Sequence, residues 1–291
     1  MAVNLAMVIP VYNRKEVTIG GLQNIYDSLE YYHSFGKSTL QIDVIVVDDG
    51  STDGTSEYIG AQYKDVTVLK GDGNLWWSGA INMGAKYASS LGRFTHVLLW
   101  NDDTICKLDY FVILENTVNQ SEEYLNSILV SKVFWINNKN ILFNFGCYYD
   151  SKTGKQDLIG LNKPDTFNEI KRVDWSGGMG TLIPIHILQK VNFFDNINFP
   201  QYHGDIDFFL RVKENGFHTY AIPKLIIYNN AETTGIVKAT NFKQLGTVFT
   251  SNSSLHNFKQ NYYFNKRHSN TFVSWLRFVK RYSGVVLKSI I

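Results

Sequence analysis

Two short apolar runs rich in β-branched residues lie near the start of the sequence, LAMVIPV (residues 5–11) and IDVIVVD (residues 42–48). Uninterrupted runs of this kind are typical of strands that are buried on both faces, as in parallel sheets. Residues 15–36 separate them, and their apolar side chains recur at helical spacing. The pattern predicts a strand–helix–strand unit at the amino-terminal end of the fold.

The alternation continues along the next sixty residues. Ser51 and Thr52 are candidate caps for a helix that follows them, residues 66–71 form a third strand, residues 78–92 a helix, and residues 95–103 a fourth strand. This order predicts an α/β fold with a doubly wound, mostly parallel central sheet flanked by helices. With 291 residues, 44% of them hydrophobic, the chain is long enough for a sizeable core in one large domain or two small ones.

The second half of the chain is less regular. Strand-like pieces occur within residues 141–150 and 172–184, and residues 206–216 read as a helix that Gly216 ends, followed by a strand over residues 218–229. We expect one domain over residues 1–235, with a division near residue 128, and a partly helical C-terminal extension over residues 236–291.

Several protein classes are excluded by composition. No stretch has the roughly 18 to 20 apolar residues that a membrane span needs, and the first residues lack the charged and small-residue pattern of a secretory leader. Cys106 and Cys147 are too few for a disulfide framework or a zinc site. We therefore expect a cytoplasmic protein.

The C-terminal extension is strongly basic. It carries nine Lys or Arg and no Asp or Glu, whereas residues 1–235 carry seven more acids than bases. We therefore expect an anionic partner. No nucleic-acid-binding motif accompanies the charge, so we do not expect this partner to be a nucleic acid.

Residues 270–291 have amphipathic helical spacing. The apolar side is formed by Phe272, Trp275, Val279, Tyr282 and Val286, and the basic side by Arg277, Lys280, Arg281 and Lys288. Such a helix either lies on an anionic membrane surface or packs on the domain or on a second subunit of a homodimer. The sequence leaves both readings open.

Acidic side chains gather where strands end. Asp48 and Asp49 close the second strand, and Asp102 and Asp103 follow the fourth. In open α/β sheets, ligands bind at the carboxyl ends of the strands. The second pair is either a Mg²⁺ or Mn²⁺ site or a solvated turn, because these cations take one or two carboxylates together with ligand phosphates.

A third acidic pair, Asp205 and Asp207, lies at the start of a helix. Acids there favour the helix dipole and can cap the first turn, and we expect Asp207 to do so. Asp205 is then a candidate general base for a nucleophilic hydroxyl.

Four glycines and two adjacent tryptophans occur within GDGNLWWSGAINMG (residues 71–84). The segment is either a buried turn of core or a flat-walled site for a ring-shaped ligand. Aromatic faces suit the C–H face of a sugar ring, so we expect Trp76 or Trp77 to line a sugar site and the other to pack in the core.

Taken in order, VIPVYNR, VVDDGSTDGT, GNLWWSGAINMG, LLWNDDT and GDIDFFLR resemble the motifs of a family 2 glycosyltransferase with the GT-A fold. The resemblance covers roughly residues 5–235, and LLWNDDT is similar to the DxD-type metal motif of that family. It implies a nucleotide-sugar-binding half over about residues 1–128 and an acceptor-binding half over residues 129–235. The LWW stretch and PQYHGD look closest to bacterial rhamnosyltransferase-type enzymes of surface polysaccharide synthesis.

The resemblance implies a role for each matching residue. Tyr12 would stack on a nucleobase, Asp49 would accept its imide N–H, Asp103 would bind the metal, and Asp205 would be the base. The implied donor contacts are Pro10, Tyr12, Asn13, Asp48, Asp49, Gly79, Asn82 and Asp102. The sugar and acceptor contacts are Trp76, Trp77, Gly177, Gly178 and His203.

Three positions depart from the family pattern. Gly204 replaces the glutamate before the catalytic Asp, which leaves Asp205 as the base with His203 to tune it. Ile81 replaces an arginine, and Asn229 stands where a metal-binding histidine is usual, so Lys266 and Arg267 are candidates to neutralise phosphate instead.

The predicted activity is inverting transfer from a UDP- or dTDP-sugar, with dTDP-rhamnose a candidate, to a hydroxyl of a glycan or lipid-linked saccharide in polysaccharide synthesis. Mn²⁺ or Mg²⁺ would be the cofactor, and the protein would work in the cytoplasm or at the inner face of the cell membrane. The alternatives are an inactive nucleotide-sugar- or glycan-binding subunit and a nucleotidyltransferase. The second would carry a glycine-rich loop after its first strand, which VYNRKEV lacks.

Overall fold

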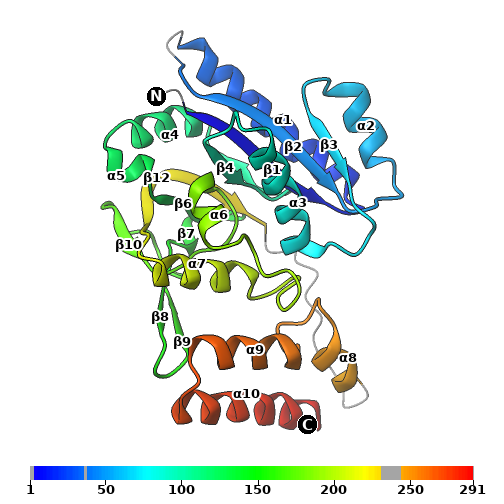
Figure 1. Ribbon diagram of the computed structural model, residues 1–291, viewed down its shortest axis with the longest axis vertical. Helices are drawn as coiled ribbons and strands as arrows, with labels where there is room; N and C mark the ends of the chain where they lie inside the picture. The colour runs from blue at the N-terminus through cyan, green and yellow to red at the C-terminus, as the bar shows by residue number, and fades with distance from the viewer. Residues whose placement is uncertain (1–2, 36–37, 231–243, 291) are drawn as a thin grey trace.

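A mixed sheet of ten strands forms the centre of the molecule (Figure 1). The structure, a computed structural model, describes residues 3–35, 38–230 and 244–290. The strands run in the order β10-β12-β6-β11-β4-β1-β2-β3, with β5 paired to β12 and β7 to β6. Their bounds are β1 Asn4–Val11, β2 Gln41–Asp48, β3 Thr67–Lys70, β4 His96–Leu99, β5 Ile105–Cys106, β6 Ile128–Trp135, β7 Asn138–Asn144, β10 Lys171–Val173, β11 Thr181–Pro184 and β12 Thr219–Asn229. A separate hairpin joins β8 (Cys147–Asp150) and β9 (Lys155–Leu158).

Strand direction explains why several motifs share one edge of the sheet. Strands β1, β2, β3 and β4 are parallel neighbours, so their carboxyl ends lie together. Strand β11 runs antiparallel to both β4 and β6, so the segment before it, residues 176–180, reaches that same edge. The edge therefore combines residues from both halves of the chain.

Helices cover both faces of the sheet, and the alternation along β1 shows how. Ala6 and Val8 belong to a core cluster that includes α3 (Trp76–Ser90) and α7 (Gly204–Glu214). Met7 and Ile9 belong to the opposite cluster, with α1 (Lys15–Ser34) and α4 (Tyr110–Val118). The remaining helices of this part are α2 (Thr55–Gln62), α5 (Glu122–Leu125) and α6 (Ile185–Lys190). The predicted α/β sheet is confirmed.

Two predicted helix caps are wrong. Helix α2 begins at Thr55, and Asp53 accepts the Thr55 N–H at 3.1 Å, so neither Ser51 nor Thr52 caps it. Helix α7 begins at Gly204 and places Asp207 inside its first turn, fully buried, where its carboxylate binds cationic side chains instead of helix N–H groups. In both cases the helix begins at a different residue from the one the sequence pattern indicated.

The C-terminal extension forms α8 (Leu245–Thr250), α9 (Phe258–His268) and α10 (Phe272–Ile290). Helix α9 lies between α7 and α10 (Figure 1). Among the residues that the structure describes, no helix is both long and apolar enough to cross a membrane.

The predicted apolar side of the last helix is divided in two. Tyr282 is buried and Trp275 half-buried, and both contact aromatic rings of α9. Phe272 and Val279 are exposed instead. The predicted basic side also changes, because Arg281 donates to Asn261 Oδ1 at 2.9 Å and to the carbonyl of Leu255 at 2.8 Å.

Candidate active site

An arginine joins the two carboxylates that follow β4. Arg14 Nη1 lies 3.1 Å from Asp102 Oδ1, and its Nη2 lies 3.0 Å from Asp103 Oδ2. Arg14 comes three residues after β1, and β1 and β4 are parallel neighbours, so their following loops meet. Arg14 had no predicted role, although its place directly after the YN of the first strand end was a usable signal.

Asp102 is the more buried of the two acids. Burial is the main cause that raises its pKa to about 7; Arg14 acts against this and Asp103 adds to it. Asp102 Oδ2 is buried and has no hydrogen-bond partner among the described residues. An unpartnered carboxylate oxygen in a buried site is costly unless a ligand satisfies it.

These carboxylates fit a hard divalent cation. Mg²⁺ and Mn²⁺ prefer oxygen ligands, and Mg²⁺ is commonly held by one or two carboxylates with waters and substrate phosphates. No group of three or more His, Cys, Asp or Glu suited to a metal exists within the described residues. A cation here would therefore need ligand oxygens in addition to Asp102 and Asp103.

Asp49 organises the loop that contains the tryptophans. Its Oδ1 accepts the N–H of Gly73 at 2.9 Å, and its Oδ2 accepts those of Leu75 at 2.9 Å and Trp76 at 3.1 Å. A carboxylate is stabilised there because the N-terminus of α3 is positive. Asp48, also buried, accepts the Ser51 N–H at 2.8 Å and so closes the next turn.

The loop after β1 is tied to the loop after β2. Asn13 has a left-handed backbone with φ of 50°, donates its N–H to Ser51 Oγ at 2.8 Å and accepts the Thr52 N–H at 2.8 Å. Tyr12, beside it, is 54% exposed, and Pro10 is half-buried at the end of β1. The tie leaves the Tyr12 ring at the surface of the predicted donor site.

Trp77 connects the loops of the site. Its indole Nε1 donates to Asn101 Oδ1 at 3.2 Å, and its backbone N–H donates to Gln201 Oε1 at 3.2 Å. A Cβ added to Gly178 would lie 2.1 Å from its ring, so the ring packs directly on that glycine. Trp77 therefore contacts the loop after β4 and the loop before β11 through its ring, and the loop before α7 through its backbone N–H.

Trp76 differs from its neighbour. It is 37% exposed and has a φ of 56°, at the point where the chain turns into α3. Of the two rings Trp76 is the more exposed, so the prediction that one tryptophan lines a sugar site now falls on Trp76 and stays a prediction.

Asp205 lies in the first turn of α7. A Cβ on Gly177 would lie 4.0 Å from its Oδ2, so the carboxylate faces the loop before β11. Its Oδ1 accepts the N–H of Ile206 at 2.7 Å. Burial raises the pKa of Asp205 to about 6, which suits a general base near neutral pH.

His203 does not tune Asp205. Its ring stacks on Phe264 with centroids 4.6 Å apart, and its Nε2 lies 3.2 Å from Asn261 Oδ1. Burial lowers its pKa to about 4, so the ring is neutral at physiological pH. The side chain is directed to α9 and away from the predicted acceptor side.

Two other predicted donor contacts, Gly79 and Asn82, pack within the fold. Asn82 donates to the carbonyl of Phe194 at 2.8 Å and accepts the Phe194 N–H at 3.0 Å, and it is buried. A Cβ on Gly79 would approach Leu75 Cβ to 3.2 Å, so this glycine allows close packing. Both residues therefore have contacts within the fold, and their contact with a donor stays a prediction.

Asp207 is the centre of a buried charge cluster. Its carboxylate binds Arg211 Nε at 2.9 Å, Arg267 Nη1 at 2.7 Å and His268 Nε2 at 2.9 Å. Burial would raise the pKa of Asp207, but the His268 hydrogen bond and the two arginines lower it below its ordinary value. Arg267 also binds Asp195 Oδ2 at 2.8 Å, so the idea that it neutralises phosphate is wrong.

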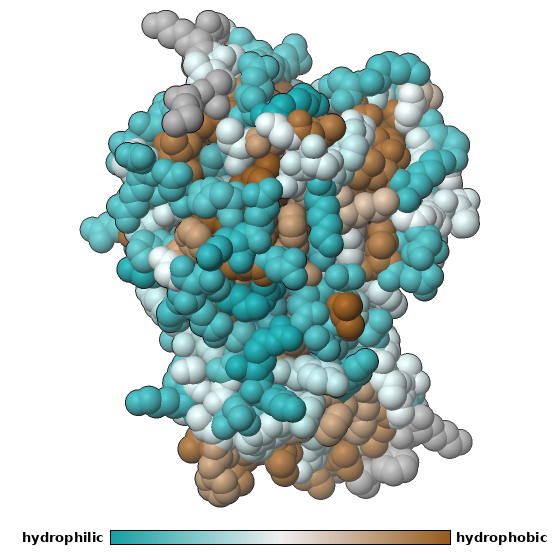
Figure 2. Space-filling view, viewed as in Figure 1, coloured by the Kyte–Doolittle hydropathy of each residue, from teal (hydrophilic) through white to brown (hydrophobic). Residues whose placement is uncertain are grey.

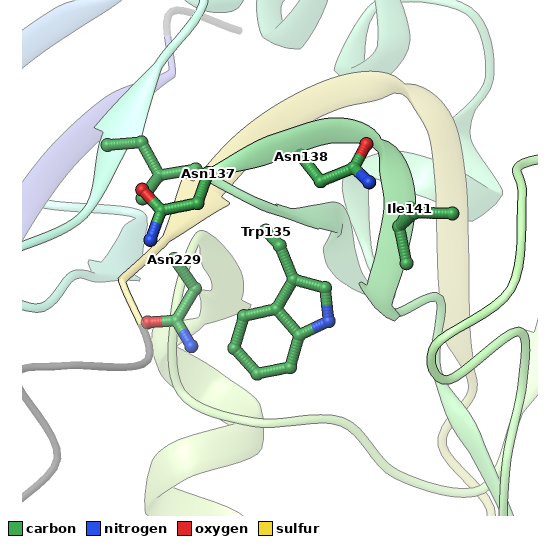
Figure 3. A pocket seen from close by; sticks show the side chains of 6 residues that line it. Trp135, Asn137, Asn138, Ile141 and Asn229 are labelled. Carbon is green, nitrogen blue, oxygen red and sulfur yellow. The ribbon is translucent and has the colours of Figure 1, made fainter.

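A separate pocket of about 300 Å³ opens at the ends of β6 and β12 (Figure 3). Trp135, Ile141 and Asn229 line it, and the Asn229 amide lies beside the indole. Because Tyr228 pairs with Ile105, β12 ends at Asn229 close to where the loop that carries Asp103 leads into β5. None of the predicted site residues lines this pocket.

Together the sheet order and its edge define the class of protein. The fold is that of the GT-A glycosyltransferases: the TarS fragment 1–349 of S. aureus superposes with a TM-score of 0.55 at 14% identity, over 78% of this chain and 60% of that one. A mannosyltransferase of Pyrobaculum calidifontis in complex with GDP-Man and Mn²⁺ has a TM-score of 0.55 at 13% identity, over 97% and 69%. GalNAc-T7 with UDP, GalNAc and Mn²⁺ has 0.58 at 12%, over 79% and 44%.

The sequence profile of glycosyl transferase family 2 matches residues 6–157, and the chain belongs to this family. It spans less than two thirds of the TarS and GalNAc-T7 chains. Comparison with curated proteins found no matching sequence.

Proposed function

We propose that the protein is an inverting glycosyltransferase that moves a sugar from a nucleotide diphosphate sugar to a hydroxyl of a glycan or lipid-linked saccharide. The observation that carries the proposal is Asp205, a half-buried carboxylate with a raised pKa beside Gly177. The same molecule carries the Asp102–Asp103 pair at the edge of its central sheet.

In this proposal each half of the edge has its own task. Tyr12 stacks on the base, Asp49 and Asn13 hold the loops around it, and Asp102 binds the ribose or sugar. Asp102 and Asp103 would hold a divalent cation, which when bound supplies positive charge for the leaving diphosphate. Arg14 supplies charge to the same two carboxylates in the protein alone.

Asp205 acts on the acceptor. Its carboxylate takes the proton of the acceptor hydroxyl, the hydroxyl oxygen forms the new bond to the anomeric carbon, and the bond from that carbon to the diphosphate breaks. The nucleoside diphosphate leaves with the bonding electron pair. Attack from the side opposite the leaving group inverts the anomeric centre. Gly177 keeps the space beside Asp205 open to the acceptor, whereas Gly178 lies against the Trp77 ring. Trp76 offers a ring face to the sugar.

The donor is the finer part of the proposal. We propose a UDP- or dTDP-sugar, with dTDP-rhamnose a candidate, on the pyrimidine contact that the resemblance gives to Asp49. Two of the similar structures were solved with uridine and guanosine diphosphate compounds respectively, so a panel of bases is required.

Thermal stabilisation by nucleoside diphosphates, each with and without Mn²⁺ or Mg²⁺, tests the proposal. A ligand that binds only the native state raises its stability with the logarithm of occupancy, whatever the acceptor. We expect UDP or dTDP to raise the melting temperature in a metal-dependent way. We also expect slow hydrolysis of the sugar donor when no acceptor is present. A shift without any hydrolysis would indicate the inactive binding subunit, and no shift with any nucleotide would overturn the proposal.

A further inference from the structure

The exposed surface of the C-terminal helices is unusually apolar. Nine of the sixteen large apolar side chains that are exposed within the described residues lie between residues 255 and 287. Figure 2 shows such side chains gathered at the lower end of the molecule, where Figure 1 places α10. Large exposed apolar patches on soluble domains mark interaction sites.

The surface has a defined shape. Phe272, Leu276, Val279 and Leu287 recur at helical spacing along α10 and are 77%, 54%, 59% and 61% exposed. The opposite side of α10 packs on α9, where Phe258 contacts Phe278 at 5.3 Å between ring centroids. We call the four exposed side chains the α10 stripe.

Aromatic residues with polar tips border the stripe. Trp275 lies 5.4 Å from Tyr262 of α9, and Tyr262 and Tyr263 are both partly exposed. Tryptophan and tyrosine are enriched at membrane–water interfaces because one end of the ring is apolar and the other is polar. This border favours a lipid interface over a dry protein contact.

Charge decides what covers the stripe. Lys259, Lys266, Arg277 and Lys280 are exposed on α9 and α10, and none of them forms an ion pair in the described part of the chain. Residues 244–290 contain no Asp or Glu. A second copy docked on α10 would bring Arg277 and Lys280 of both copies together without a carboxylate in residues 244–290 to offset them, whereas an anionic surface complements them.

We propose that α10 docks on an anionic membrane surface, with the α10 stripe inserted among the lipid headgroups and acyl chains and the lysines and Arg277 at the phosphates. An amphipathic helix with basic residues on its polar side binds membranes in this way. Lys280 lies beside the stripe along the helix, and its aliphatic stem can extend over apolar surface while its ammonium group stays at the headgroups. This inference goes beyond the proposed function, and its test needs no sugar donor.

The test is sedimentation of the full chain with vesicles of phosphatidylcholine alone or mixed with phosphatidylglycerol. We expect binding to the mixed vesicles, weaker binding to the neutral ones, and loss at high salt, which screens the headgroup charges. The double variant Leu276→Glu/Val279→Glu should bind about tenfold more weakly or worse, because two apolar side chains leave the interface. Leu91→Glu, an exposed apolar residue on α3's C-terminal side, is the matched control and should bind as wild type.

Two results would overturn the inference. One is no sedimentation with anionic vesicles, or equal sedimentation of the wild type and the double variant. The other is a wild-type protein that is a dimer in light scattering and does not sediment with vesicles, together with a double variant that is a monomer. This result would assign the stripe to a second copy. The nucleotide-induced thermal shift is measured on the same variants, so a failure of donor binding is distinguished from a failure of docking.

Discussion

A single carboxylate in this protein combines a functional with a thermodynamic role. Burial raises the pKa of Asp205 from 3.8 to about 6, so between these values the native state holds the proton more tightly than the unfolded chain does. Stability therefore falls as the pH rises through that interval, and the cost is full above pH 6. A base that works near neutrality is thus kept at the expense of stability.

Asp205→Asn should lower transfer about 10²- to 10⁴-fold, the usual contribution of a positioned base. It should also raise stability by about 1 to 3 kcal/mol at pH 7.5, because the buried charge is removed. Turnover and thermal unfolding of the same preparation check both effects. In the wild type, kcat/KM should fall below about pH 6 as Asp205 takes up its proton. Wild-type turnover in the variant would remove Asp205 from the mechanism.

Arg14 is the second residue whose removal is informative. Arg14→Met removes the guanidinium that binds both Asp102 and Asp103, so we expect the free energy of unfolding to fall by about 1 to 3 kcal/mol in the absence of metal. Mn²⁺ without nucleotide should then raise the melting temperature of the variant more than that of the wild type. Lys15→Met removes an adjacent cation that lies over the Tyr58 ring instead, and serves as control. Equal responses of both variants to Mn²⁺ would contradict a cation site at Asp102 and Asp103.

At the scale of elements, the loop before β11 is held by packing of a ring on a glycine. Gly178→Ala places a methyl group 2.1 Å from the Trp77 ring. The indole is rigid and hydrogen-bonded to Asn101, so it cannot move aside without a cost in free energy. We expect a loss of about 1 to 3 kcal/mol in urea unfolding. Gly177→Ala is the matched control, since its methyl group would meet only Asp205 Oδ2 at 4.0 Å. Similar losses in the two variants would show that backbone freedom matters here and the ring does not.

Helix α9 supplies charge to α7. Arg267→Met removes one of three partners of the fully buried Asp207 and should cost about 2 to 3 kcal/mol, whereas the exposed neighbour Lys266→Met should cost little. The lowered pKa of Asp207 means that its stabilising contribution exists above its ordinary pKa and disappears as the pH falls. The difference in free energy of unfolding between the wild type and Arg267→Met should therefore become smaller at acidic pH. Urea titrations at two pH values measure it.

For the whole molecule, the sequence predicted the sheet because continuous β-branched runs and helical spacing are local signals. It also placed Asp102, Asp103 and Asp205 at ends of elements, where the structure has them. The partners of these residues could not be predicted, since Arg14 reaches Asp102 across 88 residues and Arg267 reaches Asp207 across 60. The partners of Asn82 and His203 could not be predicted for the same reason, since they lie far away in sequence.

The Asp207 cluster bears on how the protein is made. Its carboxylate belongs to residue 207, but two of its three partners are residues 267 and 268, near the end of a 291-residue chain. During synthesis α7 emerges before α9, so Asp207 lacks these two partners until about sixty further residues have been added. A chain that stops before residue 267 keeps a buried acid with Arg211 as its remaining partner in the cluster. The charge cluster therefore distinguishes chains that include α9 from chains that stop before it.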